Sequence, residues 1–202
     1  LLHRRLEWLN LSKFHARGLV YLGARSYYEA QVPGGALAVT KLLEPELADF
    51  FSQLFLSSSM YDALPILRIS ATAAQLVGVP QTEFVRRNAA WLAERDLRGV
   101  FKFVLNALPA EMVATRLPRL ALKYFDFGEA SAHMEAERTC IAQQRGIPAE
   151  MAPWFRACVQ GFVPVALSTA GAKTVRVRSI DDEQQASLEQ ETLTLRFEFR
   201  WA

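Results

Sequence analysis

Residues 192–201, near the end of the chain, alternate strictly between apolar and polar side chains. The apolar set is Leu193, Leu195, Phe197, Phe199 and Trp201, and the polar set is Thr192, Thr194, Arg196, Glu198 and Arg200. Because successive side chains of a β-strand point to opposite faces, this pattern predicts a strand with one apolar and one polar face. The apolar face must be covered by another layer of the domain, and this limits the folds open to the chain.

A long helix is predicted over residues 150–170, where apolar side chains recur three and four positions apart. They are Met151, Trp154, Phe155, Cys158, Phe162 and Val165. Gly171 is placed to end this helix, and Pro164 is expected to kink it. Gly161 lets a neighbouring backbone or a ligand approach closely.

The remaining strands predicted for the C-terminal third lie on either side of this helix. Glu129–Glu135 and Thr139–Gln144 form a hairpin, and Val175–Ser179 pairs with the last strand across the acidic loop 181–190. The order hairpin, helix, hairpin therefore predicts an antiparallel sheet covered by helices on its apolar face.

The first two-thirds of the chain is predicted to be mainly helical. Short helices fill Ala24–Gln53, a helix capped by Asp62 runs to Gly78, and another spans Ala110–Tyr124 with a bend at Pro118. The apolar run Gly18–Gly23 is predicted to be a strand. The fold class is thus α+β, with a helical layer packed on a four- to five-stranded, mostly antiparallel sheet.

Composition indicates one globular domain. The 202 residues are 51% apolar and 22% charged, which excludes disorder, and the net charge of +2 is too small to indicate a nucleic-acid partner. We expect residues 1–16 to be an amphipathic helix or a leading segment, and residues 17–202 to be a single α+β domain. No transmembrane segment is predicted, since the longest uncharged run, 157–172, is too short to span a membrane. The first residues do not have the order of charged and apolar residues that a signal peptide needs. We therefore expect a cytoplasmic protein.

The chain carries no recognisable catalytic or metal-binding motif. Its three histidines, His3, His15 and His133, have no ligand spacing, and a Gly-x-Ser-x-Gly nucleophile motif is absent. Cys140 and Cys158 are interpreted as small buried apolar residues, the alternative being an acylated or redox-sensing thiol. We therefore expect no enzyme, no metal and no cofactor.

An aromatic cluster is the strongest candidate for a binding site. We take as candidate ligand-binding residues the aromatic side chains of this cluster together with Cys158 of the long helix. They are Phe101, Phe103, Tyr124, Phe125, Phe127, Trp154, Phe155, Cys158 and Phe162. They form either ordinary core or the wall of a pocket for an apolar ligand, in which Tyr124 and Trp154 supply polar groups.

A second candidate surface is the last hairpin, where Arg176, Arg178, Arg196 and Arg200 share one face if the strands pair as expected. Such a face is either simply solvated or a surface for an anionic partner.

Several phrases of the sequence resemble a paralogous family abundant in myxobacteria, whose function is unassigned. The phrases are Arg17–Leu22, Arg95–Phe101, Leu117–Leu120, Tyr124–Gly128 and Phe197–Trp201. That family is similar in fold to heme-based nitric oxide/oxygen sensor domains, to four-vinyl-reductase-type sensor domains and to the small subunits of the TRAPP tethering complex. The resemblance implies an apolar cavity between helices and sheet that holds a small or acyl ligand, and frequent dimerisation.

The chain departs from these relatives in two ways. Heme sensors ligate iron through a histidine on the helix before the hairpin and hold the propionates with Tyr-x-Ser-x-Arg, but Ala110–Phe127 has no histidine and Thr139–Gly146 lacks that motif. The paired cysteines of many four-vinyl-reductase-type domains are missing from Lys173–Ala202. The expected fold is therefore heme-NO-binding-like but without heme.

These observations predict a non-catalytic sensor or adaptor domain that binds a small apolar or acyl ligand, has a role in signalling, and forms a homodimer or binds a protein partner. The alternative is a ligand-free protein–protein interaction module, acting through the N-terminal helix and the hairpin face.

Overall fold

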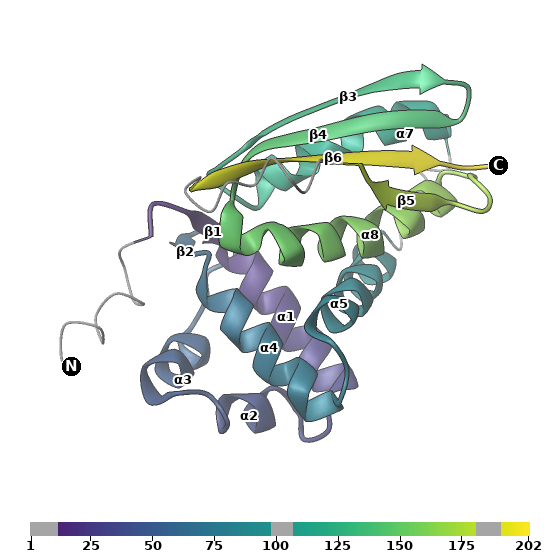
Figure 1. The fold of residues 1–202 in the computed structure, drawn as a ribbon. Helices are drawn as coiled ribbons and strands as arrows, with labels where there is room; N and C mark the ends of the chain where they lie inside the picture. Colours follow the sequence, from purple (N-terminus) through teal and green to yellow (C-terminus); the bar gives the residue numbers. More distant parts are fainter. Residues whose placement is uncertain (1–11, 98–106, 181–190) are drawn as a thin grey trace. The chain divides into compact units, whose positions relative to one another are not determined.

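The structure is a computed structural model that describes residues 12–97, 107–180 and 191–202, and these residues form two units (Figure 1). The first unit runs to Phe84 and includes Lys123–Asp126; the second holds Val85–Leu122 and Phe127–Ala202. Of the predicted N-terminal segment 1–16 only residues 12–16 are described, and they are not helical, since His15 and Ala16 belong to a β-strand. The acidic loop 181–190 lies outside the described residues.

The first unit is a set of helices joined to a two-stranded ladder. Its elements are β1 (His15–Arg17), α1 (Gly18–Gln31), α2 (Gly35–Thr40), α3 (Pro45–Ser52), β2 (Met60–Asp62), α4 (Pro65–Val77) and the first turn of α5 (Gln81–Asp96). An aromatic core holds them together: the Tyr21 and Phe55 rings stack with centroids 4.7 Å apart, and Phe55 meets Tyr61 edge-on at 4.8 Å. Such ring pairs stabilise a core beyond the area they bury.

The strand predicted for Gly18–Gly23 is wrong, because these residues form the first turns of α1. A short apolar run fits a strand or a buried helix equally well, and here the buried positions recur with a helical period through Tyr21, Ala24 and Tyr28. The first N–H groups of α1 are satisfied by the loop before β2, since Gly18 donates to the carbonyl of Ser59 at 2.8 Å.

Asp62 does not cap α4 as predicted. It lies in β2 opposite His15, so α4 begins only at Pro65, although the carboxylate still accepts the Leu64 N–H at 2.9 Å. The predicted end is confirmed, because Gly78 has a φ of 76° and takes the left-handed conformation that stops a helix.

The second unit contains a four-stranded antiparallel sheet, which confirms the α+β prediction. Its elements after α5 are α7 (Ala110–Arg116), the 3₁₀ helix η2 (Leu117–Lys123, whose last residue belongs to the first unit), β3 (Glu129–Ala136), β4 (Thr139–Pro148), η3 (Ala149–Met151), α8 (Ala152–Thr169), β5 (Arg176–Ser179) and β6 (Thr192–Arg200). The strand order is β3-β4-β6-β5, so the last strand is central and pairs with both β4 and β5.

Helices α7 and α8 both pack on this sheet, as Figure 1 shows. The apolar positions of β6 are buried as the alternation predicts, with Leu195, Phe197 and Phe199 at most 1% exposed. The predicted hairpin, the long helix containing Pro164 and the bend at Pro118 are all confirmed, the last as the change from α7 to η2. In the described ranges no helix is long and apolar enough to cross a membrane.

Helix α5 approaches α8 closely at Gly161. A Cβ at this position would overlap the carbonyl oxygen of Arg86 and lie 3.0 Å from the Cβ of Ala89. A neighbouring backbone therefore occupies the space beside Gly161, and a ligand does not.

We expect Gly161→Ala to destabilise the protein by about 1–3 kcal/mol, because the added methyl forces α5 away from α8. In an unobstructed helix the same change stabilises the protein by about 0.5–1 kcal/mol. The sign of the change in the free energy of unfolding therefore tells whether α5 and α8 meet at Gly161. Chemical denaturation measures the difference, with Ser168→Ala at an exposed position of α8 as control. A stabilised Gly161→Ala variant would show that the two helices do not meet there.

A second prediction concerns Asp62, which is 6% exposed. Burial raises the pKa of its carboxyl, opposed in part by the Leu64 N–H and by the field of His15. The folded state therefore keeps this proton to a higher pH than the unfolded chain does, and stability falls as pH rises from the ordinary carboxyl pKa through the raised one.

Asp62→Asn removes that titration while keeping an acceptor oxygen. We expect its free energy of unfolding to improve relative to wild type as pH rises through this window, as measured by urea denaturation at several pH values. Asp49→Asn makes the same change at an exposed carboxylate. Equal pH dependence in the two variants would contradict the prediction.

Candidate functional site

Three of the predicted ligand-binding residues form a stripe on one face of α8. Trp154, Cys158 and Phe162 are four residues apart in succession, and all three side chains are half-buried. Residues at this spacing lie one above another on a helix, so the three present a continuous apolar surface. We call this surface the α8 stripe.

The other predicted residues do not all join the α8 stripe. Phe155 is 3% exposed and belongs to the core, and Phe127 is half-buried at the start of the hairpin segment. Tyr124 and Phe125 belong to the first unit, where Phe125 forms an isolated bridge with Ala16. Phe101 and Phe103 lie outside the described residues.

Neither cysteine is activated. Cys140 is fully buried in β4, and burial raises the pKa of its thiol to about 11; burial also raises the pKa of the Cys158 thiol well above its ordinary value. Both thiols stay protonated at neutral pH, whereas a nucleophilic or redox-active cysteine needs a stabilised thiolate. This agrees with their interpretation as small apolar residues.

Neither of the two described histidines lies in a group of side chains that could bind a metal ion. His15 Nδ1 lies 2.7 Å from Asp126 Oδ2, and the His15 backbone N–H donates to Asp126 Oδ1, also at 2.7 Å. His133 lies on an exposed position of β3. No group of three or more His, Cys, Asp or Glu side chains suited to a metal ion occurs within residues 12–97, 107–180 and 191–202.

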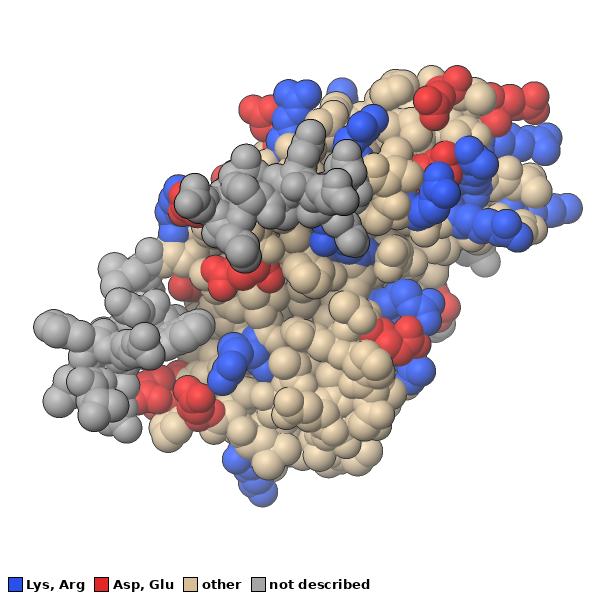
Figure 2. All heavy atoms as spheres, viewed as in Figure 1, with Lys and Arg blue, Asp and Glu red and all other residues tan. Residues whose placement is uncertain are grey.

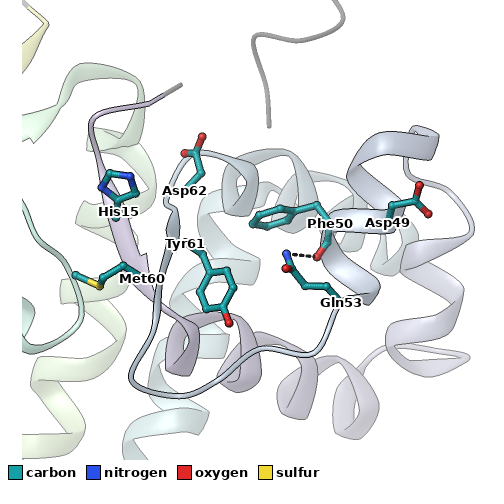
Figure 3. A pocket seen from close by; sticks show the side chains of 7 residues that line it. All are labelled: His15, Asp49, Phe50, Gln53, Met60, Tyr61 and Asp62. Carbon is teal, nitrogen blue, oxygen red and sulfur yellow. Dashed lines mark hydrogen bonds between the residues drawn. The ribbon is translucent and has the colours of Figure 1, made fainter. Parts of the chain in front are cut away.

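A cavity of about 450 Å³ opens in the first unit, between β2 and the end of α3 (Figure 3). It is lined by His15, Asp49, Phe50, Gln53, Met60, Tyr61 and Asp62. Phe50 projects from α3 toward β2, Tyr61 projects from β2 toward Gln53, and Asp49 points away from both. The Gln53 amide donates to the carbonyl of Phe50 at 2.9 Å.

The cavity lining combines apolar and polar groups. It offers two aromatic rings, an amide and the buried Asp62, and His15 of the lining pairs with Asp126. None of the predicted ligand-binding residues lines it. The walls of the cavity are brought together by the pairing of β1 with β2. No local pattern in the sequence predicts this pairing, so the cavity could not be predicted from residues such as Phe50 and Tyr61.

Comparisons with known proteins give a structural likeness without a sequence match. No family model matches the chain, and no curated protein matches it. An H-NOX protein from S. oneidensis in the Fe(II)NO ligation state superposes with a TM-score of 0.66 at 11% identity, covering 92% of this chain and 99% of that one. An oxygen-binding H-NOX domain related to soluble guanylate cyclases gives a TM-score of 0.61 at 11% identity, covering 91% and 92%.

A third structure, from work on heme distortion in the H-NOX family, gives a TM-score of 0.66 at 10% identity and covers 91% of this chain and 93% of that one. Identities this low bear on architecture and not on ligand. The chain therefore has a fold similar to that of H-NOX domains.

Proposed function

We propose that residues 17–202 act as a single non-catalytic sensor or adaptor domain that binds a small apolar or acyl ligand. The observation that carries the proposal is the likeness to H-NOX domains over at least nine-tenths of both chains, since those domains bind small ligands through heme. The α8 stripe supplies a half-buried apolar surface of the kind that lines such sites. We also propose that the domain works as a homodimer or with a protein partner.

A histidine-ligated heme does not fit the described residues. The segment before the hairpin, α7 with η2, contains no histidine, His15 is engaged by Asp126, and His133 is exposed on β3. The ligand proposed here is therefore organic and apolar.

Native mass spectrometry of the purified chain, followed by denaturing extraction, tests the proposal. We expect a bound mass that extracts as a lipid or a small aromatic molecule, and a dimeric species in the same spectrum. Hemin added to the protein should give no spectrum of a histidine-ligated iron. An adduct-free protein that also binds no acyl probe would overturn the proposal, and a histidine-ligated heme would replace it.

The α8 stripe can be tested by filling it. Cys158→Trp adds a large side chain between Trp154 and Phe162, and we expect ligand retention to fall about tenfold, the effect of a steric cost of about 1.4 kcal/mol. The retained ligand mass measures the change, while circular dichroism verifies the fold.

Ser168→Trp is the matched control, because it adds the same side chain at an exposed position of α8. It should retain the ligand. Equal retention in the two tryptophan variants would show that the stripe does not contact the ligand.

A further inference from the structure

The outward face of the β5–β6 hairpin carries four arginines. Arg176 lies directly opposite Arg200, and Arg178 directly opposite Glu198, while Arg196 follows on β6. All four arginines are exposed, and basic atoms gather at this end of the sheet in Figure 2, near β5 and the C-terminus in Figure 1. We call these four residues the arginine face.

The arginine face has more positive charge than its own acidic residue can balance. The Glu198 side chain is 11% exposed. Its carboxylate oxygens lie 2.8 Å from the Arg200 guanidinium and 3.6 Å from the Arg178 guanidinium, so one carboxylate holds two guanidinium groups. In the described part of the chain no ion pair involves Arg176 or Arg196. Like charges directly across a ladder repel, as Arg176 and Arg200 do, and an added anion would relieve that repulsion.

The side chains beside the arginines indicate which class of anionic partner this surface could bind. The neighbouring outward positions are Thr139, Ile141 and Gln143 of β4 and Thr194 of β6. The side chain of Ile141 is buried, with 6% of the residue exposed. These positions offer no aromatic ring on which a nucleic-acid base could stack. Nor do they offer the exposed apolar residues that help a basic surface hold a membrane.

The strand geometry suits an extended peptide. Among the described strands β5 is at the edge of the sheet and pairs with β6 alone. Arg176 and Arg178 are two residues apart and so about 6.6 Å apart along the strand, which matches alternate side chains of another strand. Guanidinium groups also form paired hydrogen bonds with carboxylates.

We propose that the arginine face docks an extended acidic segment of a partner protein, whose alternate carboxylates pair with its guanidinium groups. This surface is separate from the ligand site proposed above, so either proposal stands if the other fails. Binding should weaken steeply with salt, because exposed charges are screened.

Fluorescence anisotropy with the full chain tests this proposal. The probe is a labelled peptide of about ten residues that alternates glutamate and threonine. We expect Arg176→Gln combined with Arg196→Gln to weaken binding roughly tenfold, since it removes the two guanidinium groups that Glu198 does not hold. Both positions are exposed, and removing Arg176 relieves its repulsion with Arg200, so the thermal unfolding temperature should not fall.

The matched control combines Arg116→Gln with Arg119→Gln, which removes the same charge from exposed positions of α7 and η2. It should weaken binding by less than about twofold. Equal weakening by both double variants, or no peptide binding at about 1 mM, would overturn the proposal. Tighter binding to a thymidine oligonucleotide or to phosphatidylserine vesicles than to the peptide would also overturn it.

Discussion

The rest of the second unit depends on the burial of one face of β6. This strand lies between β4 and β5, and its apolar positions, Leu195, Phe197 and Phe199, are buried almost completely. Burying a large apolar side chain contributes about 1.5–3 kcal/mol, so leaving this face of β6 uncovered would cost several kcal/mol. The same burial requires α8 to cover the sheet, and α8 in turn needs a glycine where α5 crosses it.

The elements that sequence patterns predict well are those whose pattern is complete within the element. The alternation of β6, the apolar spacing of α8 and the turn between β3 and β4 are local, and the structure confirms each of them. Asp62 was predicted wrongly because its conformation depends on β1 pairing with β2, some 45 residues away in sequence, and that pairing makes the predicted helix cap a strand residue. Gly18–Gly23 was predicted wrongly for a different reason, since a short apolar run fits a strand or a buried helix equally well.

The candidate site shows the same division. Helical spacing alone is enough to place Trp154, Cys158 and Phe162 on one face of α8. The cavity beside β2 needs side chains from β1, β2 and α3, and the sequence gives no sign that these meet. The fold is similar to that of H-NOX domains, yet α7 and η2, the described segments before the β3–β4 hairpin, contain no histidine. Shared architecture and shared chemistry are therefore separate questions for this chain.

The period of two in β6 also separates two roles on a single strand. Side chains that point inward hold the core, whereas Arg196 points outward and is exposed, and within the described residues it takes part in no ion pair. Its charge is therefore not explained by stability, because exposed charges contribute at most about 1 kcal/mol. Glu198 is the exception, since it is the outward residue that is buried, and it holds Arg178 and Arg200 in place. Arg176 and Arg196, which Glu198 does not hold, are therefore the two arginines on which the docking proposal depends.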